Sequence, residues 1–261
     1  MEFGQFYQYK DGILAPISEP ADQEIGLAVA DSILFEDGKV IALDKHISRF
    51  TKSVELVAPE LAGELPGFIA QFLALVPRAG RWWPRIELHS RDSNNLLVRI
   101  RPAPETLGDA TLWTLPEPDP RLNPSVKGPD LSLGQQLRRK AKMFGGDETV
   151  LLNGDGYIAE GALSSIVWWR GDVLCAPSDA IAWLPSVTRE LVLQIAAQCE
   201  IEVRFEQTKP ADLNGCEVWL LSALNGIRLV TNWVGEDIAL AEGTHKESFA
   251  KRLRLLARQV D

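Results

Sequence analysis

The sequence predicts an α+β protein with two lobes, and three observations lead to this prediction. The chain has 261 residues, a length that suits one large domain or two smaller ones. In its second half, short apolar runs bounded by turn residues alternate with apolar residues at helical spacing. Prolines at 116, 118, 120 and 124 exclude a helix or a central strand there, because proline lacks an amide donor. We therefore expect an N-terminal lobe at 1–116, a connector at 117–126 and a C-terminal lobe at 127–261.

The predicted N-terminal lobe contains a hairpin, a helix and two further strands. Residues 31–35 and 40–43 flank Glu36-Asp37-Gly38, and an Asp-Gly pair between two apolar runs is typical of a hairpin turn. Asp44 is expected to cap a helix that continues through His46 and Arg49. Residues 85–91 and 96–101 predict two strands.

The predicted C-terminal lobe alternates helices with strands. A helix is expected at 131–144, since its basic residues gather near its C-terminal end and glycines at 145 and 146 end it. A second helix is expected at 187–198, with Ser186 or Thr188 as its cap. A basic helix at 246–260 closes the chain. The expected strands are 149–152, 164–169, 172–175, 201–205, 218–221 and 227–230.

Composition excludes several classes of protein. Lys and Arg number 27 and Asp and Glu 36, so the net charge of −9 argues against a nucleic-acid partner. The three cysteines form no CxxC pair and the three histidines are scattered, which disfavours a disulfide scaffold and a metal site. The N-terminus lacks the pattern of a secretory signal, and the longest apolar stretch, 67–76, is too short to span a membrane. We expect a cytoplasmic protein.

Three features could carry chemistry. Lys127 follows a rigid loop and precedes a helix, where loss of solvent would make its amine a nucleophile, although most such lysines are simply solvated. Residues 184–189 lead into a helix whose first amides could bind an anion, although a plain N-cap is the commoner role. Glu160 opens an apolar strand, so it is either exposed or paired with a cation.

Several motifs occur together and in order. His46-Ile47-Ser48-Arg49-Phe50 has the pattern H-x-x-R-[LF], and residues 147–152 with 156–161 follow the pattern DE-x-[LV]-LL … G-x-[IV]-x-EG. Residues 184–189 read LPSVTR, close to L-P-G-[IV]-T-R. Residues 31–39 and 84–91 add two further matches. Together these motifs resemble those of the class IV aminotransferases, and the resemblance covers most of the chain, from about 31 to about 233. That family of pyridoxal phosphate enzymes includes branched-chain and D-amino-acid aminotransferases and aminodeoxychorismate lyase.

The resemblance implies a fold and a set of site residues. It implies the two-lobed fold type IV of pyridoxal phosphate enzymes, similar to D-amino-acid aminotransferase, with the cofactor between the lobes. By the same resemblance, Lys127 would form a Schiff base with pyridoxal 5'-phosphate and then move the proton. Glu160 would pair with the pyridine nitrogen, and Arg49 and the Val187 and Thr188 amides would bind the phosphate.

The sequence also departs from the family pattern. The family's S-S-S-N after Glu-Gly reads A-L-S-S at 162–165, and the Tyr five residues after the lysine is Ser132. The family's G-T-A-A segment reads S-A-L-N at 222–225, so Ser222 or backbone amides such as that of Ala223 would replace the phosphate-binding Thr. These changes leave the cofactor site plausible and the substrate open.

The resemblance favours an aminotransferase that exchanges an amino group between an amino acid and a 2-oxo acid. Arg228 and Arg85 could receive the substrate carboxylate, although a structural ion pair suits each of them equally well. The alternative is an aminodeoxychorismate lyase that releases pyruvate and 4-aminobenzoate, which the short chain and Ala223-Leu224 favour. A third interpretation, association without catalysis, is disfavoured by the intact Lys127 and Glu160. Because the family is usually dimeric, we expect a homodimer, with no membrane partner.

Overall fold

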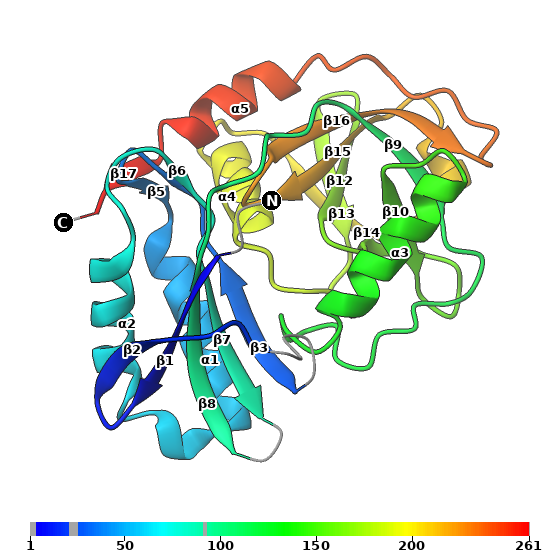
Figure 1. The fold of residues 1–261 in the computed structure, drawn as a ribbon. Helices are drawn as coiled ribbons and strands as arrows, with labels where there is room; N and C mark the ends of the chain where they lie inside the picture. The colour runs from blue at the N-terminus through cyan, green and yellow to red at the C-terminus, as the bar shows by residue number, and fades with distance from the viewer. Residues whose placement is uncertain (1–3, 21–25, 91–92, 261) are drawn as a thin grey trace. The chain divides into compact units, whose positions relative to one another are not determined.

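The computed structural model describes residues 4–20, 26–90 and 93–260, which fold into two compact units (Figure 1). Unit 1 takes its described residues from Met1–Glu105, Val126–Pro129 and Leu256–Asp261, and unit 2 from Thr106–Ser125 and Asp130–Leu255. These boundaries differ from the expected lobes at three places, one of which is the end of the chain, where residues 256–260 belong to unit 1. Residues 106–116 belong to unit 2 because their strand joins its sheet, and the Lys127 segment belongs to unit 1 because its backbone is bonded to a strand there.

Unit 1 is built on a five-stranded antiparallel sheet that carries two helices on one face (Figure 1). Large aromatic side chains of the helices, including Phe50, Phe68 and Phe72, are fully buried against that face. Their burial supplies the main hydrophobic stabilisation of the unit. The sheet order is β2 (Ile13–Ile17), β1 (Gln5–Lys10), β8 (Asn94–Ile100), β7 (Arg85–Ser90) and β3 (Leu27–Ser32), and the helices are α1 (Leu43–Val57) and α2 (Leu65–Leu75).

A second, small sheet of unit 1 confirms the predicted hairpin and corrects one other expectation. Strand β4 (Phe35–Glu36) pairs with β5 (Lys39–Ile41) around a turn at Asp37 and Gly38, which both have positive φ. Strand β5 also pairs with β17 (Ala257–Gln259), and β4 with β6 (Arg81–Trp82). The expected helix at 246–260 is therefore wrong in its last part, because backbone pairing with β5 draws the end of the chain into this sheet.

The start of α1 also differs from the prediction. The helix begins at Leu43, and Ala42 is its N-cap in a left-handed conformation without a side-chain cap. Asp44 lies inside the first turn, where its negative charge interacts favourably with the positive end of the helix dipole. The expectation that Asp44 caps the helix is therefore wrong.

Unit 2 is built on an eight-stranded mixed sheet with three helices, and it confirms the predicted alternation. Helix α3 (Leu131–Met143) packs against β10, α4 (Val187–Gln198) against β15, and α5 (Lys246–Arg254) against β16. The sheet order is β11 (Ile158–Gly161), β10 (Glu148–Leu152), β9 (Ala110–Thr114), β16 (Gly226–Val234), β15 (Glu217–Ser222), β12 (Ser165–Arg170), β13 (Val173–Pro177) and β14 (Val203–Glu206). The prolines at 116–124 lie between β9 and α3 in a segment with neither helix nor strand, as predicted. Of the helices in the described part of the chain, none is both long and apolar enough to cross a bilayer.

Candidate active site

Glu160 is a buried carboxylate at the end of an apolar strand. It lies on β11 opposite Leu151 of β10, and 4% of its surface is exposed. Its Oε1 accepts two hydrogen bonds, one from Arg121 Nη1 at 2.5 Å and one from the Leu184 amide at 2.8 Å. Burial raises the pKa of Glu160 above its usual value, although the Arg121 charge and the two hydrogen bonds act in the opposite direction. The carboxylate is therefore both basic and held in place.

The cation that pairs with Glu160 comes from the proline-rich segment. Arg121 directs Nε and Nη2 at the Asp119 carboxylate, with the shortest contact at 2.7 Å, and directs Nη1 at Glu160. Burial alone would lower the pKa of Arg121, but the hydrogen bonds and charges of Asp119 and Glu160 raise it, so the guanidinium stays charged. Sequence reasoning missed Arg121 and Asp119 because nothing in the local pattern links residue 121 to residue 160.

The N-terminus of α4 follows closely after Leu184, whose amide binds Glu160. Of the two predicted candidates, Ser186 is the N-cap and Thr188 lies inside the helix: Ser186 Oγ accepts from the Arg189 amide at 3.2 Å, and the Ser186 carbonyl accepts from the Glu190 amide. Val187 and Thr188 are the first two residues of α4, so their amides have no acceptor within the helix, and both residues are buried. Two amides at the positive end of a helix dipole form a suitable site for an anion such as phosphate.

The loop before α4 is held by a cation–π contact. The Arg189 guanidinium lies 3.8 Å from the centre of the Trp183 ring, and Nη2 donates to the Pro177 carbonyl at 3.0 Å. Burial lowers the pKa of Arg189 to about 10. Because Trp183 precedes Leu184, this contact steadies the amide that binds Glu160.

Lys127 is half-buried in an irregular segment of unit 1 that is tied to β3. Its carbonyl accepts from the Ala30 amide at 2.6 Å. The next residue must be glycine, because a Cβ at Gly128 would lie 2.4 Å from the Ala28 carbonyl oxygen and 2.7 Å from its carbon. The close approach of two backbones therefore sets the position of the lysine.

Arg49 is bonded to a buried aspartate that the sequence analysis did not single out. Its Nε and Nη2 donate to the two oxygens of Asp31 at 2.7 and 2.9 Å, and His46 Nδ1 lies 2.8 Å from Asp31 Oδ1. Burial alone would raise the pKa of Asp31, but the Arg49 charge and the hydrogen bonds from His46 and Arg49 lower it to about 2. A charged residue inside the apolar run at 27–30 was the signal that could have identified it. Since Asp31 follows Ala30 on β3, one strand holds both Arg49 and the Lys127 backbone.

The remaining candidates all have contacts within their own units. Arg228 is buried in unit 2 and donates to the carbonyls of Gly108 at 2.6 Å and Asp109 at 3.0 Å, and burial lowers its pKa. Arg85 on β7 pairs with Glu87, whose other oxygen lies 2.6 Å from His89. Each arginine thus has the structural pairing that the sequence left open as an alternative to a substrate contact.

Ser222 and Ala223 lie at the turn between β15 and β16. Ser222 ends β15, and its Oγ accepts from the Asn225 amide at 3.2 Å; Ala223 follows it in the turn. In unit 2 the structure therefore provides Glu160, the α4 N-terminus and this turn, and in unit 1 it brings Arg49 and Lys127 to β3. Among the residues that the structure describes, no cluster of three or more His, Cys, Asp or Glu could hold a metal ion.

Comparison with known proteins identifies relatives over most of the chain. Residues 28–233 match the model of the family described as amino-transferase class IV. A probable branched-chain-amino-acid aminotransferase of Rickettsia conorii is 25% identical over 203 residues, which is 70% of each chain. The protein of the same name from Rickettsia bellii is 24% identical over 191 residues, or 66% of each chain. The matched stretch thus spans about two thirds of the length of these relatives.

Solved structures share the fold at low sequence identity. The branched-chain aminotransferase of Thermoproteus uzoniensis with norvaline superposes with a TM-score of 0.80 at 19% identity, covering 96% of this chain and 94% of that one. The branched-chain aminotransferase of Escherichia coli gives a TM-score of 0.80 at 16% identity, covering 97% and 92%. A hypothetical aminotransferase of Mycobacterium tuberculosis in its alpha-ketoglutarate and PMP bound form gives 0.73 at 17%, covering 97% and 98%. These likenesses confirm the predicted fold type, and the family match shows that the chain belongs to the class IV aminotransferases.

Proposed function

We propose that this chain is a pyridoxal 5'-phosphate-dependent aminotransferase that moves an amino group between an amino acid and a 2-oxo acid. The buried Glu160 carboxylate, held by Arg121 and the Leu184 amide in a member of this family, is the observation that carries the proposal. The named relatives are probable branched-chain aminotransferases, and structural neighbours hold norvaline or alpha-ketoglutarate. We therefore propose small amino acids and 2-oxo acids as the substrates.

The residues present suit this cofactor. A pyridine nitrogen needs a fixed carboxylate, which Glu160 provides, and a phosphate needs donors, which Arg49 and the Val187 and Thr188 amides provide. Ser222 and the Ala223 amide, at the turn after β15, complete the proposed phosphate ligands. When bound, pyridoxal 5'-phosphate supplies an aldehyde that reacts with amines and a ring that accepts the electron pair released at the substrate α-carbon.

The protein side of the proposed reaction uses two groups. Glu160 holds a proton at the ring nitrogen, and burial makes its carboxylate more basic and therefore a stronger acceptor for that proton. Lys127 supplies the amine that anchors the cofactor and, once a substrate amine has displaced it, moves the proton at the substrate α-carbon as base and then as acid. The tight packing of Gly128 on β3 keeps this amine on one short, fixed segment.

Binding and covalent trapping of the cofactor test the proposal. The wild-type protein is expected to bind pyridoxal 5'-phosphate with a visible absorption band, and borohydride reduction should fix the label on the Lys127 peptide. Lys127→Ala should lose both the band and the label, whereas Lys142→Ala, on an exposed site of α3, should keep them. A wild-type protein that does not bind the cofactor would overturn the proposal.

A single assay separates amino transfer from the lyase reaction. Transfer predicts that an amino donor converts the bound cofactor to its amine form, and that a 2-oxo acid restores it. Pyruvate release from aminodeoxychorismate without an amino acceptor would instead show a lyase. The names of the relatives favour transfer.

Arg85 and Arg228 stay in the proposal as candidate ligands for the substrate carboxylate. If either one binds it, replacement by methionine raises the KM for the amino donor without changing the absorption of the bound cofactor. An unchanged KM would remove that arginine and leave it a structural role, as its contacts with Glu87 or with the Gly108 carbonyl suggest.

We also propose that the protein acts as a homodimer in the cytoplasm, because its family is usually dimeric and its three cysteines show no disulfide pattern. Sedimentation equilibrium of the purified chain measures its oligomeric state. A mass of one chain at assay concentration would contradict a homodimer.

A further inference from the structure

We propose that Asp119 is a positioning residue, which holds the Arg121 guanidinium against Glu160 and so keeps this carboxylate ionised where the cofactor ring needs it. The proposal rests on the function proposed above and assigns a role to the proline-rich segment. That segment is then a part of the site rather than only a connection between β9 and α3.

The geometry of the guanidinium supports this role. Arg121 Nε lies 3.0 and 3.1 Å from the two Asp119 oxygens, and Nη2 lies 2.7 Å from Oδ2. Because the guanidinium is planar, fixing Nε and Nη2 also fixes the direction of Nη1, which lies 2.5 Å from Glu160 Oε1. One carboxylate therefore aims the arginine at the other.

Asp119 is itself held in place. Its amide donates to the Leu152 carbonyl of β10 at 2.8 Å, and its Oδ1 also accepts from the Arg121 amide at 3.0 Å. Pro118 and Pro120 flank it and restrict the backbone. Little conformational freedom remains to be lost when the arginine pairs with Glu160, so the contact costs little entropy.

The charges give the expected direction of the effect. The Arg121 charge and hydrogen bond lower the pKa of Glu160, and these two influences exceed the opposing one of the Asp119 charge. Loss of the Asp119 carboxylate would therefore act mainly by releasing Arg121, which raises the proton affinity of Glu160. A pure charge effect of Asp119 would have the opposite sign, because removing a nearby negative charge favours the ionised carboxylate.

The test compares Asp119→Asn with the wild-type full chain. Infrared difference spectra across a pH titration follow the protonated carboxyl band of Glu160, which Glu160→Gln assigns. The midpoint is expected at higher pH in Asp119→Asn, and the dissociation constant of pyridoxal 5'-phosphate is expected to rise about tenfold, the equivalent of one charged hydrogen bond. A midpoint that is unmoved or lower would overturn the proposal.

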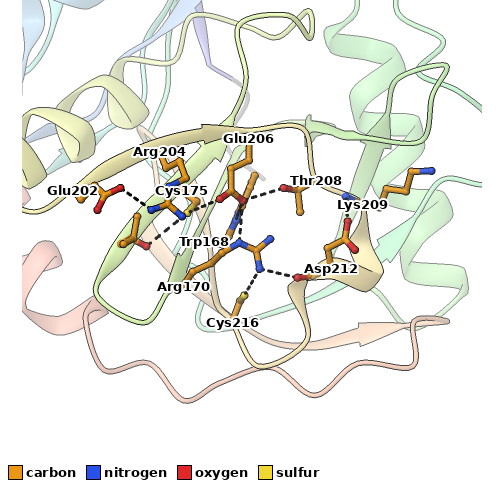
Figure 2. Close-up of polar contacts among 11 residues, drawn as sticks. Trp168, Arg170, Cys175, Glu202, Arg204, Glu206, Thr208, Lys209, Asp212 and Cys216 are labelled. Carbon is orange, nitrogen blue, oxygen red and sulfur yellow. Dashed lines mark hydrogen bonds and ion pairs between the residues drawn. The ribbon is translucent and has the colours of Figure 1, made fainter.

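Another ion pair of unit 2 provides the matched control. Figure 2 shows Glu206 between Arg170, Trp168 and Thr208, and its Oε2 lies 3.0 Å from Arg170 Nε. Like Asp119→Asn, Glu206→Gln removes one negative charge from an ion pair with an arginine. In the described structure the Arg170–Glu206 pair has no contact with Glu160. It should leave the Glu160 titration and the cofactor affinity unchanged.

Arg121→Lys gives a second, independent reading. Lysine keeps the charge but lacks the planar fork, so it should shift the Glu160 midpoint in the same direction as Asp119→Asn. The double variant should then shift it no further, because both changes remove one interaction. Additive shifts would overturn the proposal. The infrared result is obtained without cofactor, so a wild-type protein that fails to bind pyridoxal 5'-phosphate refutes the proposed function alone.

Discussion

Replacing Asp31 by asparagine is expected to remove a large pH-dependent part of the stability of unit 1. The Asp31 side chain is fully buried between Arg49 and His46, and it accepts two hydrogen bonds from the arginine. Removing one partner of a buried ion pair typically costs about 3–5 kcal/mol, because the other charge is left without compensation. Asparagine keeps one acceptor oxygen, so we expect Asp31→Asn to lower the free energy of unfolding by about 3 kcal/mol at neutral pH.

The pH dependence follows from the direction of the Asp31 shift. Its pKa falls from 3.8 to about 2 on folding, so the unfolded chain binds the proton more tightly than the folded one. The stabilisation is therefore fully present above the unfolded pKa and is lost as the pH falls towards the folded pKa. At about 1.4 kcal/mol for each pKa unit, this shift is worth about 2 kcal/mol.

Urea unfolding at a series of pH values tests this prediction. Hydrogen exchange of α1 peptides reports on unit 1, since α1 carries both Arg49 and His46. The difference in unfolding free energy between wild type and Asp31→Asn should shrink by about 2 kcal/mol between about pH 5 and pH 2. The control is Glu36→Gln, which removes one partner of an exposed pair with Arg81. It should change the free energy of unfolding by less than about 1 kcal/mol. A wild-type-to-variant difference that is constant over this range would refute the reasoning.

Three further substitutions test the local packing of the site. Gly128→Ala places a Cβ against the backbone of β3, so borohydride trapping of the cofactor should drop sharply, while Gly154→Ala, with open space around it, should leave trapping unchanged. Ser186→Ala removes the N-cap of α4 and should lower the urea unfolding free energy by about 1 kcal/mol; a change below about 0.3 kcal/mol would contradict the cap. Trp183→Ala removes the ring under Arg189 and should weaken cofactor binding severalfold in a fluorescence titration, and unchanged affinity would show that the stack does not support the loop.

Local patterns predicted much of the fold because they depend on short stretches of chain. The turn at Asp37 and Gly38, the helix at Val187–Gln198 and its Ser186 cap follow from turn chemistry, helical spacing and a side-chain acceptor. The strands at 5–17 and the helix at Leu65–Leu75 were not predicted, although the helix covers most of the longest apolar stretch, 67–76. Apolar spacing alone does not tell a buried helix from a buried strand.

The sequence by itself determined the family, most of the helices and strands of unit 2 and the residue types that a cofactor site needs. Only the tertiary structure decided which charges meet: Asp31 binds Arg49 18 residues away, and Arg121 reaches Glu160 39 residues away. It also decided that residues 257–259 form a strand rather than helix, since their partner is β5. The physical reason is common to these cases. A buried charge or an edge strand must find a partner, and the topology of the fold, not the neighbouring sequence, brings that partner within reach.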